Sequence, residues 1–538
     1  MNCLVLEAAG RLLIVDCGVM FPEEENGVEV VHPSFDFLLQ QADRIEGVWI
    51  THGHEDHIGA VPYLLENLDI PVYAPPYALG LIREKLSERV LPFTPRLRTI
   101  TANEPVTMGP FRLTPVPVAH SIIDSMALVA ETPGGTILHS GDYKLDLDGV
   151  GPDLCPTLRR LKEAIPQTGI DLLLSDSTGI EEKGVTGSER VVTERIDEIL
   201  GEARGRVFVA LFSSNVERVE AVAKLAVKHQ RRVALSGRSV NVHTRIASDL
   251  GRLRLPAERI VSLEEAAQLP PREILVIISG TQGEPRSNLV RLAEGTHRYL
   301  SVSEGDLVIL SSRFIPGNEL AISRMIDGLL RQRATVVHHQ IDPRIHVSGH
   351  ARHDEQKLVL ETIRPRCFIP VHGTLRHLVT HAHLARSLGV GQVEVMENGD
   401  IAELSSRGVK RMDERIPVGR IHVDGVGGLS EMVIRERRHL GDRGILVVVL
   451  MMDPDRGCLR QIPEIITKGV VQAEAEAAFV AEATAVLVKE LKEAPSKVLC
   501  ETDAVRELAR RVIKRFVTKT LERQPVLIPV VLNSGDEI

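Results

Sequence analysis

Short apolar runs recur through the first half of the chain, and each is followed at once by turn-forming or polar residues. RLLIVDCG, GVWITHGH, TILHSGD, DLLLSDST and RVFVALFSSN all have this form. Runs of this length that end at glycine, serine or aspartate are typical of buried strands. Between the runs, residues 188–204 and 215–229 have apolar residues at helical spacing. The alternation predicts an α/β fold, in which functional side chains gather in the loops at strand ends.

The last hundred residues predict a separate small α/β domain. The apolar runs GILVVVLMM (444–452) and VLIPVVL (526–532) indicate two strands, and residues 472–494 and 501–523 have helical spacing. The preceding stretch, 403–442, is rich in glycine, arginine and aspartate and only weakly periodic. It is interpreted as a connector between this domain and the rest of the chain.

The length and composition limit the class of protein. A chain of 538 residues is long enough for roughly two to four domains. Its six cysteines are scattered without a CxxC pair, which favours a reducing compartment over a disulfide framework. The N-terminus has neither a basic region nor a cleavage site of small residues, and no apolar run reaches the length of a membrane span. We therefore expect a cytoplasmic protein with no membrane partner.

The net charge argues weakly against a nucleic-acid partner. It is −9 at pH 7, whereas nucleic-acid binders are often basic. A cluster of bound dications and a local basic groove can still attract phosphate to an acidic protein. Aromatic residues make up 3% of the chain, so extensive stacking of bases on aromatic rings is not expected.

The segment Thr51–His57 (THGHEDH) is the most informative one for chemistry. It places three histidines and an aspartate directly after the apolar run GVWI. Buried histidine and aspartate cost free energy unless they are paired or bind metal. His52 and His54 can face one ion, and Asp56 and His57 a second. Imidazole and carboxylate suit Zn²⁺, with Mn²⁺ or Mg²⁺ as alternatives. The plain alternative is a polar loop whose histidines occur by chance.

The form HxHxDH resembles the metallo-β-lactamase superfamily, and further motifs of that family follow in order. They are Asp16 in IVDCG, His120 in VAHSIIDS and Asp142 in HSGDYK. The resemblance implies that Asp16 supports the metal loop, that His120 is a ligand, and that Asp142 bridges two ions. Taken singly, each of these motifs is more typical of a turn or of a satisfied polar residue.

The later part of the chain resembles the β-CASP branch of this superfamily, which acts on nucleic acids. A long insertion follows Asp142, and the branch motifs are matched by Asp176 in LLLSDST, His350 in HVSGHA and His372 in PVHG. Further segments, such as DCGVMFPEEE, SGTQGEP and SSRFIPGNE, are similar to ribonuclease J over nearly the whole chain.

Three departures from the ribonuclease J pattern stand out. Glu217 lies where the family commonly has histidine, and Thr374 where it usually has glutamate. The absence of a carboxylate at Thr374 is expected to affect metal preference and rate rather than the class of reaction. The chain begins at MNCLVLE, where the family has an additional strand and a glycine-rich turn. We expect either a start that lies further upstream or a missing edge strand.

The resemblance implies a specific architecture. Residues 1–188 and 343–420 are expected to form a metallo-β-lactamase αββα sandwich, into which residues 189–342 are inserted as a β-CASP α/β domain. Residues 421–440 are expected to be a linker, and 441–538 a small C-terminal α/β domain.

The resemblance also implies the site. Two Zn²⁺ ions are expected, one held by His52, His54 and His120 and the other by Asp56, His57 and His372, with Asp142 between them. Asp56, His57, Asp142 and His350 are expected to carry the reaction, and Asp176 to support the ligands. The phosphate of a 5′-terminal nucleotide is expected to contact Ser213, Ser214, Asn215, His346, Val347, Ser348, Gly349 and His350. The alternative for residues 213–215 is the N-cap of a helix.

The activity implied is zinc-dependent hydrolysis of RNA phosphodiesters. It combines 5′-to-3′ exonuclease with endonuclease action, in mRNA decay and rRNA maturation, on single strands with a 5′-monophosphate. A homodimer or homotetramer and partners in an RNA-decay complex are expected. Two alternatives remain open from the residues alone: a catalytically weak RNA-binding subunit of a ribonuclease complex, and a metallohydrolase of DNA or of a small ester.

Overall fold

The structure, a computed structural model, describes residues 1–22, 27–147, 155–425, 427–453, 456–521 and 524–533. The end of the DCGVMFPEEE motif lies outside these residues. The chain divides into two units, Met1–Glu23 with Val31–Arg420 and Glu24–Val30 with Ile421–Ile538. In the described part of the chain, no helix combines the length and the apolar character needed to cross a membrane.

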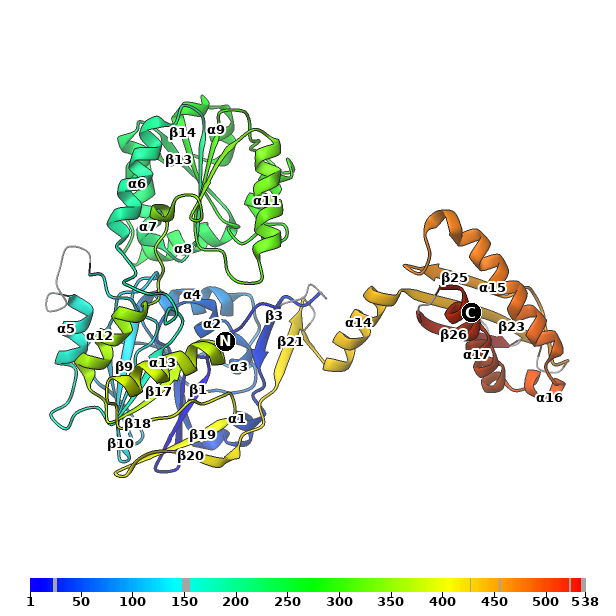
Figure 1. The fold of residues 1–538 in the computed structure, drawn as a ribbon, viewed down its shortest axis with the longest axis horizontal. Coiled ribbons are helices and arrows are strands. Elements are labelled where there is room, and N and C mark those ends of the chain that lie inside the picture. Colours follow the sequence, from blue (N-terminus) through cyan, green and yellow to red (C-terminus); the bar gives the residue numbers. More distant parts are fainter. Residues whose placement is uncertain (23–26, 148–154, 426, 454–455, 522–523, 534–538) are drawn as a thin grey trace. The chain divides into compact units, whose positions relative to one another are not determined.

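Two β-sheets form the centre of the first unit (Figure 1). The first has the order β1-β2-β4-β5-β6: Leu4–Ala8, Arg11–Val15, Ile45–Trp49, Val72–Ala74 and Leu97–Thr99. The second has the order β18-β17-β11-β10-β9-β8-β7: Gln392–Val393, Cys367–Val371, Leu172–Asp176, Gly135–His139, Met126–Thr132, Phe111–Pro117 and Val106–Met108. Each sheet therefore combines parallel strands with antiparallel ones.

The apolar core between these sheets explains why both sheets have nearly continuous apolar strands. Trp49, Phe111, Leu128 and Leu174 from the two sheets meet there and are buried. Helices α5 (Pro156–Glu163), α12 (His353–Ile363) and α13 (Leu375–Ser387) bury apolar side chains against the other face of the second sheet. The first sheet is accompanied by α2 (Glu55–Ile58), α3 (Val61–Leu65) and α4 (Pro76–Ser87). The result is the expected helix–sheet–sheet–helix order.

The inserted segment forms a parallel five-stranded sheet of its own, with the order β13-β14-β12-β15-β16. Its strands are Arg232–Ser236, Ile274–Ile278, Val207–Leu211, Leu307–Ser311 and Thr335–His338. Helices α6 (Glu189–Glu202) and α7 (Val216–Lys228) cover one face, and α10 (Asn288–Ala293) and α11 (Glu319–Arg331) cover the other. Figure 1 shows this sheet enclosed between helices. The helices predicted at 188–204 and 215–229 are confirmed as α6 and α7.

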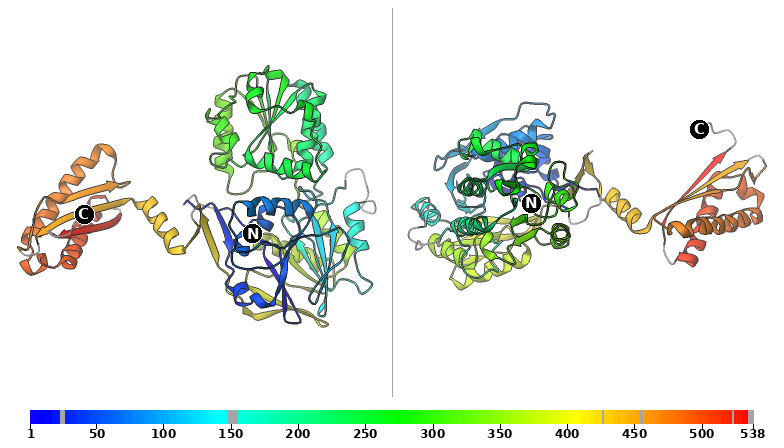
Figure 2. Two further views of the ribbon diagram at one scale, coloured as in Figure 1. Left: turned by 180° about the vertical axis from the view of Figure 1, so that it is seen from behind. Right: turned by 90° about the horizontal axis from the view of Figure 1, so that it is seen from above.

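The second unit has a four-stranded sheet with both long helices on one face (Figure 2). Strand β23 (Ile445–Asp453) pairs in parallel with β26 (Val526–Asn533) and antiparallel with β25 (Glu464–Lys468) and β24 (Cys458–Leu459). The helices are α15 (Ala473–Glu493) and α17 (Thr502–Leu521), joined by α16 (Ser496–Leu499). The two predicted strands and helices are present, and β24, β25 and α16 are additional.

The segment 421–440, which the sequence suggested was a connector, contains regular structure. It holds most of β21 (Arg420–Asp424), β22 (Gly427–Leu429) and most of α14 (Glu431–Arg443). The remaining named elements of the chain are α1 (Asp36–Gln40), β3 (Val30–Pro33), α8 (Arg238–Asp249), α9 (Leu263–Gln268), β19 (Asp400–Ser405) and β20 (Gly408–Arg415), with short 3-10 turns between some of them.

Candidate metal centre

Most of the predicted ligands follow the ends of parallel strands, whereas His120 follows β8, which pairs antiparallel with its neighbours. Strand β2 is parallel to β4, and Asp16 and the Thr51–His57 segment follow these two strands. Strands β10, β11 and β17 are also parallel, and they lead to Asp142, Asp176 and His372. Because parallel strands end at the same edge of a sheet, residues far apart in the sequence are brought together there.

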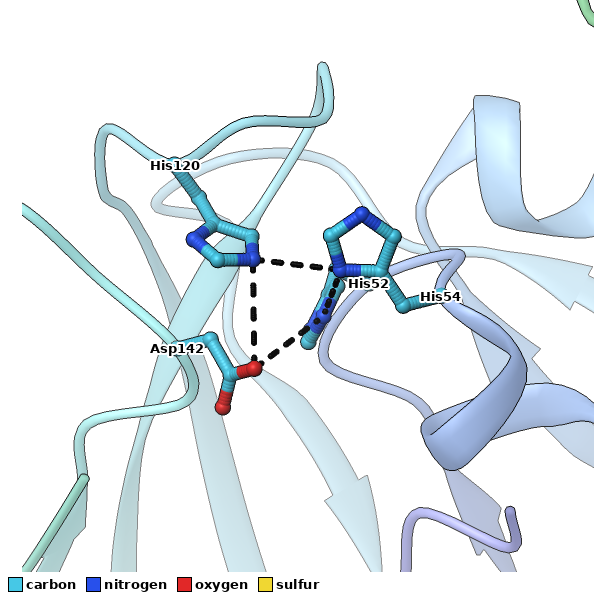
Figure 3. A group of neighbouring side chains, drawn as sticks. All are labelled: His52, His54, His120 and Asp142. Atoms are coloured by element: carbon cyan, nitrogen blue, oxygen red, sulfur yellow. Dashed lines mark hydrogen bonds and ion pairs between the residues drawn. The ribbon is translucent and has the colours of Figure 1, made fainter. Parts of the chain in front are cut away.

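One group of ligand atoms lies around His54 (Figure 3). Its Nδ1 is 3.1 Å from the Nε2 of His52 and 3.1 Å from the Nε2 of His120. Asp142 Oδ2 lies 3.6 Å from His52 Nε2 and 3.8 Å from His120 Nε2. Figure 3 shows these four side chains turned toward one another, with His52 and His54 on one loop and His120 and Asp142 on two others.

A second group shares the same carboxylate oxygen. Asp142 Oδ2 lies 3.3 Å from His57 Nε2 and 3.5 Å from His372 Nε2. Asp56 Oδ2 lies 3.1 Å from His372 Nε2 and 3.5 Å from His57 Nε2. In each group all ligand atoms lie within 4.8 Å of one another. The structure therefore brings all seven predicted ligands together, with Asp142 common to both groups.

The ring nitrogens that face away from the cluster indicate whether these histidines can bind a cation, because their hydrogen bonds determine which nitrogen has a lone pair. His120 Nδ1 donates to the carbonyl of Gly349 at 2.6 Å. A carbonyl can only accept, so the Nε2 of His120 has a free lone pair that faces the cluster. His57 Nδ1 lies 2.7 Å from Asp16 Oδ2 and donates in the same way. Imidazole lone pairs that converge on a buried carboxylate suit a divalent cation, and the donor set of nitrogen and oxygen fits Zn²⁺.

Asp16 supports two of the ligands. Its Oδ2 accepts from His57 and, at 2.8 Å, from the hydroxyl of Thr51, which lies 3.0 Å from His52 Nδ1. Its Oδ1 accepts from the backbone amide of Thr51 at 2.8 Å. Asp16 has a φ of 61°, a left-handed conformation that aspartate tolerates better than most residues. The predicted supporting position of Asp16 thus corresponds to a network of hydrogen bonds.

Asp176 occupies the corresponding position on the other side of the site. Its Oδ2 lies 2.7 Å from His350 Nδ1, and its Oδ1 accepts from the hydroxyl of Thr178 at 2.7 Å. That hydroxyl in turn lies 2.7 Å from His372 Nδ1. Asp176 therefore orients His350 directly and His372 through Thr178.

Thr374 has no part in this support. It is the N-cap residue of α13, where its backbone amide donates to the Nδ1 of His377 at 3.4 Å. The position that differs from the family pattern therefore fulfils a helix-capping role, and the outer nitrogen of His372 is satisfied without it.

Burial and charge divide the site into neutral and charged rings. Burial lowers the pKa of His54 to about 4 and holds the pKa of His52 and His120 well below the usual value. Burial also opposes a charge on His57, but the neighbouring Asp142, Asp56 and Asp16 raise its pKa well above the usual value. Neutral imidazole is the form that binds metal, so the group around His54 is ready for a cation without losing protons.

His350 differs from the ligands in its environment. Burial lowers its pKa, but the stronger combined influence of Asp176, through charge and hydrogen bonding, raises the pKa above its usual value. Its Nδ1 lies 3.9 Å from Asp142 Oδ2, so the ring is at the edge of the metal centre. A protonated imidazole beside the metals can donate a proton to a leaving group.

The predicted phosphate-binding residues come from two loops that meet at this centre. Ser214, in the loop after β12, has its Oγ 3.3 Å from His54 Nε2. Asn215 is the N-cap of α7, and its side chain accepts from the backbone amide of Arg218. The helix-cap interpretation is therefore correct for Asn215, whereas Ser214 contacts a predicted ligand.

The loop 346–350 has mixed roles. His346 Nδ1 contacts the guanidinium of Arg218 at 3.0 Å, and Val347 packs against the core of the inserted domain. Ser348 Oγ accepts from the backbone amide of His350. A side chain at Gly349 would have its Cβ 2.8 Å from the ring of His120, so only glycine allows this close approach.

Three residues at the site were not predicted from the sequence. They are Thr51, Thr178 and Asn2, whose amide nitrogen lies 3.2 Å from Asp56 Oδ2 and 3.0 Å from His57 Nε2. Thr51 and Thr178 each stand next to or near a predicted residue in the same motif, THGH and SDST. Their position beside these motifs could have identified the two threonines as site residues. No motif lies near Asn2, so the sequence does not indicate its role.

Four family models match the chain in succession. "Metallo-beta-lactamase superfamily" matches residues 2–163 and "Ribonuclease J, beta-CASP domain" residues 204–329. "Zn-dependent metallo-hydrolase RNA specificity domain" matches residues 336–396, and "Ribonuclease J C-terminal domain" residues 432–534.

Similar proteins cover nearly the whole chain. A ribonuclease J of Helicobacter pylori is 36% identical over 98% of this chain and 77% of its own length. A ribonuclease J of Corynebacterium glutamicum is 38% identical over 99% of this chain and 74% of its own, and ribonuclease J2 of Bacillus subtilis is 34% identical over 99% and 96%. A solved structure of a protein of unknown function from Enterococcus faecalis has the same fold, with a TM-score of 0.50 at 16% identity over 76% of this chain and 96% of its own.

Proposed function

The chain belongs to the ribonuclease J family, and on that premise we propose that it is a zinc-dependent ribonuclease. The proposal includes 5′-to-3′ exonuclease action with endonuclease activity, in mRNA decay and rRNA maturation. The observation that carries it is the position of Asp142 Oδ2, which lies within 4 Å of ring nitrogens of His52, His57, His120, His350 and His372.

We propose two ion positions for these residues. His52, His54 and His120 would hold one ion, Asp56, His57 and His372 the other, and Asp142 would bridge them. A pair of such ions lowers the pKa of bound water toward neutrality and offsets negative charge on phosphoryl oxygens. The protein holds its ligands in place through Asp16, Thr51, Asp176 and Thr178, so little rearrangement is needed on binding.

His350 is the residue we propose to protonate the leaving 3′-oxygen of the cleaved bond. Its ring is held by Asp176, which raises its pKa, and it forms a third group of close polar atoms with Asp142, Asp176 and His372. Proton donation at this oxygen would leave a 5′-phosphate and a 3′-hydroxyl as products.

The 5′-terminal phosphate is proposed to bind between the loops 213–215 and 346–350. The backbone amides of Ser213, Ser214, Ser348 and Gly349 have no hydrogen-bond partner among the described residues, so they are free to donate to a phosphate. Capture of the 5′ end beside the metals fits removal of nucleotides from that end.

The test is the replacement of Asp142 by alanine. Purified wild-type protein should cleave 5′-monophosphorylated single-stranded RNA in the presence of zinc, and the variant should lose at least about a hundredfold in rate, as expected when a ligand shared by two metals is removed. Asp69→Ala, at an exposed aspartate on the surface, is the matched control and should retain the wild-type rate. Cleavage by Asp142→Ala at the wild-type rate would refute the site.

The same assay separates RNA from other substrates. A DNA strand of identical sequence and 5′ end should be cleaved more slowly than the RNA, and faster cleavage of DNA would refute the substrate. Zinc analysis of the purified chain should give close to two equivalents. A chain that binds no zinc and cleaves neither strand would instead be a binding subunit.

We further propose that the chain associates with itself through its C-terminal domain. One face of the sheet is covered by α15 and α17, while the other presents apolar side chains. On that face, Val447 of β23 is paired with Ile466 of β25 on one side and with Ile528 of β26 on the other, so the three side chains lie in one row. The two outer isoleucines are 43% and 42% exposed, so the row is open to a second copy.

A further inference from the structure

We propose that the C-terminal domain holds a second site for RNA, a cationic cavity that binds a backbone phosphate and shares no residue with the metal centre. The cavity has a volume of about 240 Å³ and lies between α14, α17 and the start of β26. Four basic side chains line it: His439, Arg443, Arg510 and Lys514. The described residues of its lining include no aspartate or glutamate.

The cations of the cavity are mostly not paired within the domain. In the described part of the chain, the side chains of Arg443 and Lys514 have no hydrogen bond or ion pair, and only Arg510 has a carboxylate partner, Glu507 at 3.2 Å. Basic groups that converge without carboxylates repel one another, and a bound anion removes that repulsion.

The cluster stands out against the charge of the whole chain. The net charge of the protein is −9, whereas α17 alone has six lysine or arginine residues against two carboxylates, Asp503 and Glu507. A local basic surface on an acidic protein attracts phosphate while the rest of the surface repels it. A phosphate is therefore attracted to this cluster in particular, whereas on a generally basic protein it would be attracted to the whole surface.

The rest of the lining suits a nucleotide better than a bare anion. Thr518 and Gln524 add neutral hydrogen-bonding groups, and Val517, Pro525 and Leu527 add apolar surface. Contacts from arginine and lysine to phosphate, together with polar contacts to the sugar, position a strand without reading its sequence. We therefore commit to single-stranded RNA as the occupant, which rests on the proposed function.

A simpler account exists for two of the residues. His439 and Arg443 lie in the last turns of α14, where basic side chains interact favourably with the helix dipole. If that account is right, substitution of these residues changes stability and leaves RNA binding unchanged. A binding measurement therefore distinguishes it from the proposed RNA site.

The experiment measures binding without cleavage. Full-length protein with Asp142→Asn, which disables the proposed metal centre, is titrated against a fluorescent single-stranded RNA over a range of KCl concentrations. The cavity variant is Arg443→Gln with Lys514→Gln. The matched control is Arg435→Gln with Arg511→Gln, which removes the same charge from the same two helices at exposed positions outside the cavity lining.

We expect the cavity variant to bind RNA roughly tenfold more weakly at low salt. The slope of log affinity against log salt should fall by about 0.7 for each phosphate that the protein no longer neutralises. The control should change affinity less than about twofold. Equal decreases in affinity for both variants would show that only net charge matters, which would refute the site. Unchanged affinity in both variants would refute it as well.

Two further measurements keep the result unambiguous. The charge-preserving variant Arg443→Lys with Lys514→Arg should bind RNA nearly as well as the parent, even if the glutamine variant is less stable. Inorganic phosphate and a mononucleotide, added at constant ionic strength, should not displace the RNA at concentrations below the millimolar range. Displacement there would identify a site for free phosphate and refute the proposal for RNA.

The outcome does not depend on catalysis. Cleavage is measured separately, on a short 5′-phosphorylated RNA, in protein with Asp142 and the cavity both unchanged. If no RNA is cleaved by any form, the proposed function fails, while the binding result for the cavity stands by itself.

Discussion

The hydroxyl of Ser214 lies 3.3 Å from the Nε2 of His54, so the inserted domain contacts a predicted metal ligand directly. His54 follows β4 of the sandwich, and Ser214 follows β12 of the insertion. The other ring nitrogen, Nδ1, faces the ligand cluster. Ser214 can therefore fix the orientation of His54 only while the two domains keep their present arrangement.

The contact predicts that Ser214→Ala lowers the affinity for zinc. Partners of ligand histidines typically contribute about 10- to 100-fold to metal affinity. We expect zinc affinity to decrease by an amount near the lower end of this range, because the hydrogen bond between Ser214 and His54 is long. Zinc titration with a competing chelator measures it, and Ser213→Ala, one residue away and without this contact, is the control. If both variants bind zinc like the wild type, Ser214 acts on the substrate alone.

The second prediction concerns the 5′ end of the RNA. The free backbone amides in the loops 213–215 and 346–350 are neutral donors, and a pocket for one phosphate disfavours a larger and more charged triphosphate. RNA with a 5′-monophosphate should therefore be degraded about tenfold faster than RNA with a 5′-triphosphate. The rates are compared on one RNA prepared with both ends.

A substitution at Ser213 tests the same pocket with less interference than its neighbours allow. Asn215 caps α7, where a cap typically contributes about 1 kcal/mol, and Ser214 contacts His54. Ser213→Val should reduce the preference for the monophosphate and leave internal cleavage measurable. Equal rates on both ends in the wild-type protein would show that this pocket does not sense the 5′ end.

The third prediction concerns the open face of the C-terminal sheet. Ile466→Lys with Ile528→Lys places two charges in the apolar row around Val447 and should prevent self-association, because a buried unpaired charge is costly at an interface. Light scattering should then give the mass of a single chain. The control, Ala477→Lys with Ala481→Lys, adds the same charge at exposed positions on α15 and should keep the wild-type mass. Equal masses for all three proteins would contradict the role of this face.

The fourth prediction concerns stability in acid. His381 on α13 is buried beside Phe368 and Ser177, and burial lowers its pKa to about 3. In the unfolded chain histidine takes up a proton near pH 6.5. Below that pH the unfolded state therefore binds a proton that the folded state excludes, and the free energy of unfolding falls as the pH is lowered.

A single such group lowers the free energy of unfolding by up to about 1.4 kcal/mol per pH unit, or about 2 kcal/mol between pH 6.5 and pH 5. Urea unfolding of metal-free protein at several pH values measures it. In His381→Asn, which keeps a group able to bond Ser177, the fall over this range should be smaller by about that amount. Parallel curves for the two proteins would show that His381 does not carry the effect.

The candidate ligands and the main helices and strands could be predicted from local sequence patterns. The THGHEDH segment contains four of the predicted ligands, and the apolar runs before it and before Asp142 and Asp176 are long enough to be interpreted as buried strands. The helical spacing of 472–494 and 501–523 likewise corresponds to α15 and α17 within a residue or two. These are local patterns, which depend only on neighbouring residues.

The hydrogen bonds that orient the candidate ligands follow from the tertiary structure alone. Ser214 and His54 are 160 residues apart, and Thr178 and His372 are 194 apart. A hydroxyl can be the partner of a ring nitrogen only if the fold brings their two loops into contact. The residue pattern within either loop does not predict that contact. For the same reason Thr374, which lies next to a ligand motif, proved to be the N-cap of a helix. The cationic cavity likewise depends on tertiary structure, because the basic residues of α14 and α17 have the pattern of ordinary solvated side chains and line one cavity only in the folded domain.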